Sequence, residues 1–285
     1  MSKVAVVTDS TAYLPAEMSN GYPIFSTPLQ VIWDEQIFRD GIDIQPGEFY
    51  QRLQQSKTMP TTSQATPAAL TDLYGRLLNE DYQIISIHIS SKLSGTLDSA
   101  VQARENFPGA PIALIDSETT AMPMGFQVMS VARIAAQGAT LQECISLANE
   151  AKSRTGVFFV VTTLEFLHRG GRIGGAAAFL GTALNLKPIL KIHDGKVDAV
   201  ERVRTASKAI DRMLTLFQEQ VGARRPVRIA ALHANAPEEA SKVLERARAL
   251  FGTHEVNDAV LSPISPVLGT HTGPGCVGLA FMAGM

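Results

Sequence analysis

Short apolar runs rich in β-branched residues alternate with longer segments of helical periodicity through the first half of this chain. The apolar runs are of strand length and fall at residues 4–7, 24–31, 84–89 and 112–116. The intervening segments carry helix signals, such as Thr66 and Pro67 at a start and Gly138 beyond an end. They predict helices at residues 67–79, 95–106, 122–137 and 141–154. This alternation is typical of a parallel sheet covered by helices.

The pattern changes near residue 155, where an apolar run at 156–161 predicts the first strand of a second unit. Asp194 and Gly195 lie between two extended runs and predict a tight antiparallel hairpin. Helices predicted at 206–221 and 237–251 flank a strand at 227–231. We therefore predict an α/β protein of two domains. They are an N-terminal parallel-sheet, Rossmann-like domain at 1–155 and a C-terminal mixed-sheet α/β domain at 156–285.

The composition limits the classes of partner. With 45% hydrophobic residues, a chain of 285 residues can bury a substantial core. The 25 basic and 27 acidic side chains give a net charge of -2, which provides no field to attract nucleic acid or anionic lipid. No apolar run approaches the roughly 20 residues of a membrane-spanning helix, and the first residues lack a signal-peptide pattern. We expect no nucleic-acid partner, no stable membrane insertion and a cytoplasmic location.

Common motifs of metal and cofactor chemistry are missing or out of context. Cys144 and Cys276 are the only cysteines, and their spacing predicts neither a disulfide framework nor a metal site. Residues 273–278 match the GxGxxG pattern, but the seven residues that follow cannot supply the second strand and acidic ribose partner of a dinucleotide site. We interpret this segment as the glycine-rich start of a helix. Without a Walker A, HExxH or GxSxG motif, we expect no cofactor.

Three loops gather hydroxyl or glycine residues where we expect strands to end and helices to begin, the edge at which open α/β sheets bind ligands. Residues 58–67 hold more hydroxyl side chains than the capping of one helix requires. Residues 90–96 are also rich in hydroxyls, which suit either an anion at a helix N-terminus or simple capping. The third loop region joins Arg172 and His271 from two glycine-rich segments. A lone Arg or His in such loops is more often structural.

The chain resembles the DegV family in six short segments that occur in order along essentially its whole length. These segments are Thr8-Asp9-Ser10-Thr11, residues 60–64, residues 93–96, Asp116-Ser117, residues 170–173 and residues 271–275. The resemblance implies that one long-chain fatty acid, such as palmitate, lies in a tunnel between the two domains. It also implies a non-catalytic, substrate-presenting subunit of a bacterial fatty acid kinase. Such a subunit offers the fatty acid carboxylate to a separate ATP-binding subunit.

The resemblance assigns roles to particular residues. Thr62, Ser94 and the backbone N–H of Gly95 are expected to hydrogen-bond the carboxylate. Arg172 and His271 are expected to orient the head group, directly or through water. No residue is expected to be catalytic, and none to bind a metal.

Other positions of the resemblance lie away from the expected head group. Arg204 matches a basic position expected to face the kinase. The chain departs from the family pattern at Ala65, where many relatives carry proline, and at residues 174–175, where others carry a polar residue. Neither departure touches the expected carboxylate ligands.

The physical chemistry of a carrier agrees with this assignment. Each buried methylene gains about 0.8 kcal/mol, so about fifteen of them supply roughly 12 kcal/mol before ordering costs. A buried carboxylate needs donors, and hydroxyl and N–H groups provide them without a salt bridge. Residues 158–159, 166–167, 179–180 and 184–190 supply apolar material for a tunnel, although core packing would use the same residues.

Two other functions remain open from the sequence. One is an acyl hydrolase or transferase with Ser94 as nucleophile, His271 as base and Asp116 orienting the base, although no elbow motif surrounds Ser94. The other is a purely interacting or regulatory protein, which leaves the clustered hydroxyls without a role.

Overall fold

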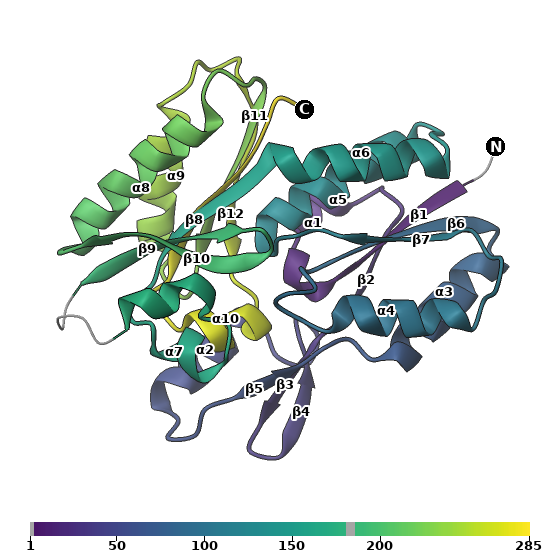
Figure 1. Ribbon diagram of the computed structural model, residues 1–285, viewed down its shortest axis with the longest axis horizontal. Coiled ribbons are helices and arrows are strands. Elements are labelled where there is room, and N and C mark those ends of the chain that lie inside the picture. The colour runs from purple at the N-terminus through teal and green to yellow at the C-terminus, as the bar shows by residue number, and fades with distance from the viewer. Residues whose placement is uncertain (1–2, 181–185) are drawn as a thin grey trace.

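The computed structural model describes residues 3–180 and 186–285, and its first sheet is parallel. The four strands, in the order β2-β1-β6-β7, are β1 (Lys3–Asp9), β2 (Ile24–Thr27), β6 (Tyr82–His88) and β7 (Ile112–Asp116). One face is covered by α3 (Pro67–Asn79) and α4 (Thr96–Glu105), and the other by α5 (Ala121–Ala136) and α6 (Leu141–Arg154) (Figure 1). The predicted alternation of strands and helices is confirmed.

A second, six-stranded sheet is mixed. Its strands, in the order β10-β9-β8-β13-β11-β12, are β8 (Thr155–Val160), β9 (Lys187–His193), β10 (Lys196–Val203), β11 (Val227–His233), β12 (Val256–Pro263) and β13 (Val277–Ala283). The β11–β12 pair is parallel and the other pairs are antiparallel. Helices α8 (Ala206–Val221) and α9 (Pro237–Arg248) pack on one face through an apolar cluster that includes Phe217 and Phe281.

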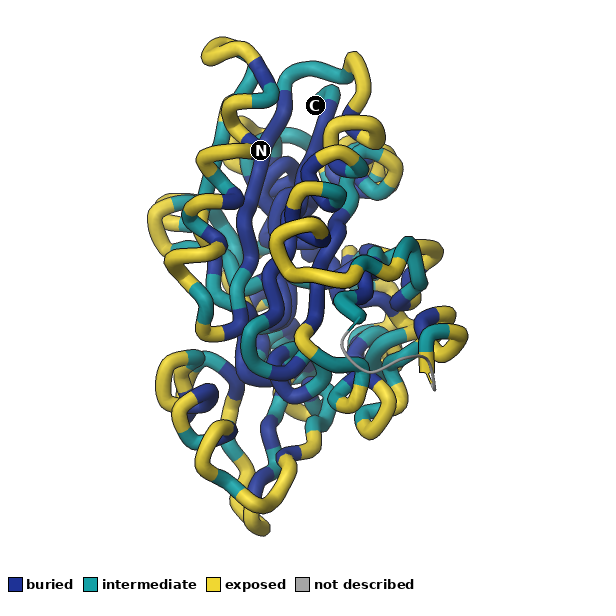
Figure 2. The backbone as a smooth tube through the Cα atoms, turned by 90° about the vertical axis from the view of Figure 1, so that its left-hand side faces the viewer, coloured by how far each residue is buried: buried dark blue, intermediate teal, exposed yellow. Residues whose placement is uncertain are grey.

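Helix α5 lies between the two sheets, because it contacts β1 of the parallel sheet and both β8 and β13 of the mixed sheet. Twelve of its sixteen residues are buried. The buried strands run through the middle of the molecule, with exposed loops and helix faces around them (Figure 2). This layered α/β arrangement confirms the predicted fold class, whereas a domain boundary at residue 155 stays a prediction.

The hairpin between β9 and β10 forms at Asp194 and Gly195 as predicted. Both residues have positive φ angles, 47° and 73°, as a two-residue type I′ turn requires. The hairpin also contacts the loop after β6, because Ser90 Oγ donates to Gly195 O at 2.8 Å and Lys92 Nζ donates to Asp194 O at 2.8 Å. The turn therefore ties the mixed sheet to the parallel sheet.

A third, small antiparallel sheet corrects the prediction of a single strand at 24–31. Pro28 lies between β2 and a separate strand, β3 (Gln30–Trp33), which leaves the parallel sheet and pairs with β4 (Gln36–Arg39) and β5 (Thr61–Ser63). Proline lacks the N–H that a continuous strand needs there. The sheet contacts α10 (Pro266–Thr272), and α10 also contacts α2 (Pro46–Gln55).

The glycine-rich segment at 273–278 does not begin a helix, which corrects our interpretation. It follows α10, and Gly273 and Gly275 turn the chain with φ angles of 72° and 76° into β13. All seven residues of β13 are buried. They include Gly278 and Ala280, small residues that interrupt the run of large apolar side chains typical of a buried strand, so the sequence did not predict this strand.

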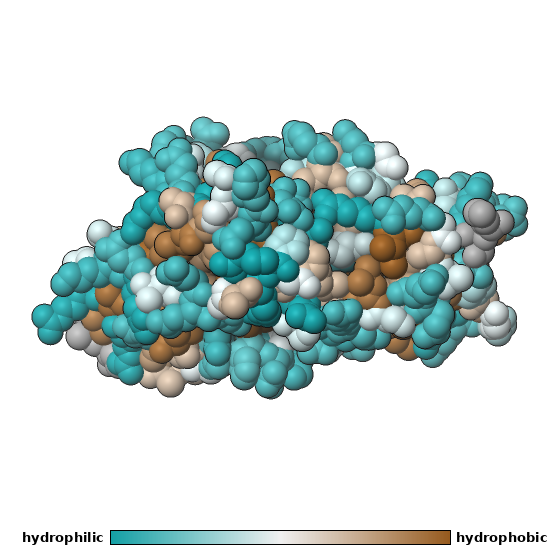
Figure 3. Space-filling model, turned by 90° about the horizontal axis from the view of Figure 1, so that it is seen from above, coloured by the Kyte–Doolittle hydropathy of each residue, from teal (hydrophilic) through white to brown (hydrophobic). Residues whose placement is uncertain are grey.

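The remaining short elements are η1 (Ser10–Ala12), α1 (Ala16–Ser19), α7 (Glu165–Arg169) and η2 (Gly174–Phe179). Among the described residues, no helix combines the length and apolar character needed to cross a membrane. The face in Figure 3 carries mostly hydrophilic side chains, with apolar ones in separate patches.

Candidate functional site

A mostly apolar cavity of about 210 Å³ lies among the three sheets and α10. The loops after β6 and β7 form one wall, the mixed sheet forms the opposite wall, and β5 with α10 forms a third. The apolar lining residues include Leu29, Ile89, Leu93, Val157, Phe159, Leu167, Ile192, Val197, Leu232, Ile264, Val267 and Leu268. Of the apolar segments expected to form a tunnel, Phe159 and Leu167 reach the cavity, whereas Phe158 belongs to the cluster under α8. Residues 184–185 lie outside the described residues.

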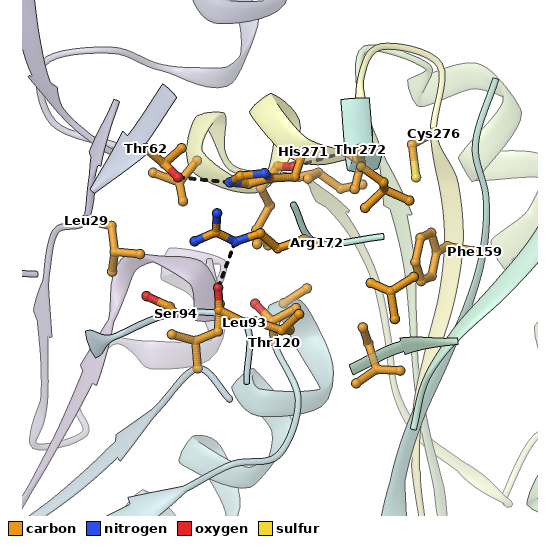
Figure 4. Close-up of a pocket in the computed structure, with 18 of the residues that line it drawn as sticks. Leu29, Thr62, Leu93, Ser94, Thr120, Phe159, Arg172, His271, Thr272 and Cys276 are labelled. Carbon is orange, nitrogen blue, oxygen red and sulfur yellow. Dashed lines mark hydrogen bonds between the residues drawn. The ribbon is translucent and has the colours of Figure 1, made fainter. Parts of the chain in front are cut away.

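All five residues expected to contact a head group line this cavity: Thr62, Ser94, Gly95, Arg172 and His271. They come from β5, the start of α4, the α7–η2 connection and α10. In Figure 4, Thr62, Ser94 and Arg172 lie toward one side of the cavity, and Phe159 and Cys276 lie toward the other. The structure brings the expected residues together, and their contact with a ligand stays a prediction.

Two of the three loops lie where a strand ends and a helix begins, as expected. Residues 58–67 run from β5 into α3, and residues 90–96 lead from β6 into α4. Thr62 itself lies within β5 of the small sheet, and His271 lies in the last turn of α10. These residues reach one site through packing of distant segments rather than through a shared sheet edge.

His271 is neutral at physiological pH. Its Nε2 lies 2.9 Å from Thr62 Oγ1, and its Nδ1 has no hydrogen-bond partner in the described part of the chain. Burial, and to a smaller extent the positive charge of Arg172, lowers the pKa of His271 to about 4. Gly170 lies against the imidazole so closely that a Cβ at this position would overlap Nδ1. The ring is therefore held in place by Thr62 on one side and by the α7–η2 connection on the other.

Arg172 carries the positive charge of the site. Its Nε donates to Leu93 O at 3.1 Å, and its Nη1 donates to Gly170 O at 2.7 Å. It forms no ion pair with any described residue, and no described Asp or Glu lines the cavity. The guanidinium is thus held by carbonyl oxygens, and its charge is left to attract an anion.

Ser94 and Gly95 form the start of α4 at the cavity. Ser94 Oγ lies 3.0 Å from Thr96 Oγ1 and accepts a hydrogen bond from Thr96 N at 3.3 Å. A Cβ on Gly95 would overlap the side-chain amide of Gln64, which is held by Ser99 Oγ at 2.9 Å. A side chain at position 95 would therefore displace the amide of Gln64 from its contact with Ser99.

The three residues of the hydrolase alternative, Ser94, His271 and Asp116, are not hydrogen-bonded to one another. Ser94 Oγ is bonded to Thr96 rather than to His271. Asp116 accepts from Ser91 Oγ at 2.6 Å and from Glu118 N at 2.8 Å, so it does not orient the imidazole. The arrangement lacks the contacts between nucleophile, base and orienting acid that such catalysis uses.

Sequence reasoning missed a buried chain of hydrogen bonds at the end of β1. His88 Nδ1 lies 3.1 Å from Asp9 Oδ2, and His88 Nε2 lies 2.7 Å from Ser86 Oγ, which accepts from Tyr74 OH at 2.8 Å. All four side chains are fully buried. This constellation holds the parallel sheet together and is separate from the cavity.

Thr120 is a cavity residue that sequence reasoning also missed. It lies between β7 and α5, after Asp116-Ser117, and it lines the cavity. The signal was available, because Thr119 and Thr120 follow a predicted strand and precede a predicted helix, as the hydroxyls of residues 90–96 do.

The buried, neutral His271 predicts a loss of stability on acidification. Because its folded pKa lies below the ordinary 6.5, protonation favours the unfolded chain, and stability is lost as the pH falls from about 6.5 toward 4. Asp40 has the opposite effect on stability. Burial raises its pKa to about 6, so its contribution to the stability of the folded chain is lost as the pH rises through that value. We therefore expect His271→Gln to show a smaller decline in thermal midpoint over this window than the wild type. Equal declines in the two proteins would contradict the prediction.

The layered sheets and the mostly apolar cavity place this chain among α/β proteins that have a cavity between their sheets. The chain belongs to the DegV family, because the family profile described as "Uncharacterised protein, DegV family" matches residues 3–284. It is 37% identical over 279 residues to Protein DegV of Bacillus subtilis, covering 98% of each chain. It is 36% identical over 282 residues to a DegV domain-containing protein of Halalkalibacterium halodurans, covering 99% of each.

Solved structures agree with the family assignment. A DegV family protein from Thermus thermophilus, described for its fatty acid binding, matches with a TM-score of 0.92 and 34% identity, covering 99% of each chain. DegV from Bacillus subtilis, described as a fatty acid binding protein, matches with a TM-score of 0.89 and 35% identity. The match covers 99% of this chain and 100% of that one.

Proposed function

We propose that this protein binds one long-chain fatty acid in the cavity, with the carboxylate beside Thr62 and Ser94 and the acyl chain along the apolar walls. The observation that carries the proposal is the lining of the cavity. The hydroxyls of Thr62 and Ser94 lie on the same side as the Arg172 guanidinium, which forms no ion pair with a described residue, and most other lining residues are apolar. The two similar structures described as fatty acid binding support the same ligand class.

The polar side of the cavity suits a carboxylate. Ser94 and Thr62 offer hydroxyl groups, Gly95 offers its backbone N–H, and Arg172 supplies positive charge. Hydrogen bonds to a charged group contribute about 1.5–3 kcal/mol each. His271 supports this arrangement, because an Nε2–H donated to Thr62 Oγ1 leaves the threonine proton free to donate to the ligand.

We further propose that the protein carries out no catalysis itself and presents the carboxylate to a separate, ATP-binding kinase subunit. Arg204 supports this role, because it is exposed and directly follows β10, the strand that carries the cavity residue Val197. Exposed arginine is a common anchor in protein interfaces.

The buried free thiols of Cys144 and Cys276 agree with a reducing, cytoplasmic compartment.

Native mass spectrometry of the purified protein tests the proposed ligand. We expect a mass increment of one fatty acid per chain, exchangeable with added palmitate.

With ATP and the kinase subunit, the loaded protein should yield acyl phosphate. Arg204→Ala should lower that yield while palmitate binding stays unchanged, and Arg248→Ala, on α9, serves as a surface control. A protein that neither retains nor takes up an acyl chain contradicts the binding proposal, and an unaltered yield contradicts the role of Arg204.

A further inference from the structure

Helix α5 begins at the cavity, and its N-cap residue, Thr120, does not cap the helix with its side chain. Four long helices are preceded by threonine: α3 by Thr66, α5 by Thr120, α6 by Thr140 and α8 by Thr205. In three of them the threonine hydroxyl accepts a hydrogen bond from a first-turn N–H. Thr120 makes no such bond, although it precedes a sixteen-residue helix. Its hydroxyl is therefore not used for capping.

The hydroxyl of Thr120 has no other partner either. Thr120 is only 9% exposed, and its Oγ1 is buried without a hydrogen bond in the part of the chain that the structure describes. In Figure 4 the side chain is drawn beside Leu93 and below Arg172, with its oxygen toward the middle of the view. Most buried hydroxyls in folded proteins are paired, so an unpaired one beside a ligand cavity points to a missing partner.

The backbone adds another unpaired donor at the same place. The N–H group of Ala121 donates no hydrogen bond to any residue within 3–180 or 186–285. Ala121 also lines the cavity. The first-turn N–H groups of a helix carry partial positive charge and favour an oxygen acceptor. Thr120 and Ala121 thus form a pair of donors, which we call the α5 donor group.

We propose that the α5 donor group binds a second oxygen of the ligand, so that the cavity is built for fatty acids that carry a hydroxyl or keto group on the acyl chain. This inference rests on the proposed fatty acid function and names the ligand class more narrowly. A methylene placed here leaves the two donors without an acceptor, whereas a hydroxyl or carbonyl oxygen accepts from them. A site built to hydrogen-bond a ligand oxygen discriminates against the analogue that lacks it.

Competitive binding of palmitate and hydroxypalmitates tests the inference. The competitors carry the hydroxyl near the carboxyl end, at mid-chain or at the ω end, and each displaces a fluorescent fatty acid from the full-length protein. We expect one positional isomer to bind roughly tenfold more tightly than palmitate, the effect of one well-made hydrogen bond in a buried site. Thr120→Val, which keeps the shape of the side chain, should remove most of that advantage.

Two further variants control for packing. Thr120→Ser keeps the hydroxyl and should keep the advantage. Thr272→Val removes a cavity hydroxyl that already donates to Leu268 O at 3.2 Å and should also keep it. The inference is overturned if no hydroxypalmitate binds the wild type more tightly than palmitate, which is the result expected if water occupies the α5 donor group. It is also overturned if the tighter binding of a hydroxypalmitate persists in Thr120→Val. Failure of palmitate and all hydroxypalmitates to bind the wild type contradicts the proposed function instead.

Discussion

Replacing Thr62 and Ser94 together with alanine is expected to weaken palmitate binding by roughly 100-fold, because two hydroxyl donors to the carboxylate are lost in a largely apolar cavity. Each single substitution should weaken binding roughly tenfold. The carboxylate keeps the charge of Arg172 and the N–H of Gly95, so binding is reduced rather than abolished. Titration with palmitate in a fluorescence displacement assay measures the change.

Neighbouring hydroxyls in the same segments provide matched controls. Thr61 precedes Thr62 in β5, and Ser91 lies in the loop that carries Ser94, yet both are exposed and neither lines the cavity. A Thr61→Ala, Ser91→Ala double variant should bind palmitate as the wild type does. If this control loses as much affinity as the cavity variant, or the cavity variant loses none, the carboxylate lies elsewhere.

The hydroxyls of residues 58–67 show how far a sequence pattern can be interpreted. Their number exceeded what capping requires, and the structure divides four of the five among three roles. Thr58 bonds Asp34 at 2.6 Å, Thr66 caps α3 through Ala69 N, and Thr62 and Ser63 line the cavity. The pattern located a functional segment, but the role of each hydroxyl depends on partners distant in sequence.

The site could be predicted only in part, for a physical reason. Helices such as α3 and α8 could be predicted because caps and periodicity are local signals. The three-residue strand β5 and the seven-residue helix α10 have weak local signals and owe their place to packing. Since Thr62 and His271 lie on these two elements, 209 positions apart, their hydrogen bond could not be inferred from spacing.

The segment Thr8-Asp9-Ser10-Thr11 helped to identify the family, yet its aspartate lies away from the cavity and serves the fold. Asp9 Oδ1 accepts from Thr11 N at 3.1 Å and from Thr11 Oγ1 at 2.6 Å, and Oδ2 accepts from Ile89 N at 2.9 Å. With His88 Nδ1 at 3.1 Å, four groups surround one fully buried carboxylate. It joins the end of β1 to the end of β6, from which the loop carrying Ser94 begins.

Asp9→Ala is therefore expected to lower the free energy of unfolding by about 3–5 kcal/mol, because the buried partners of the carboxylate, His88 among them, lose their acceptor. Urea denaturation followed by circular dichroism measures this loss. Asp9→Asn keeps the shape and one acceptor oxygen, so its cost should be intermediate. Asp72→Ala, at an exposed position of α3, should change stability by no more than about 0.5 kcal/mol. A loss as small for Asp9→Ala as for Asp72→Ala would show that the buried network does not hold β1 and β6 together.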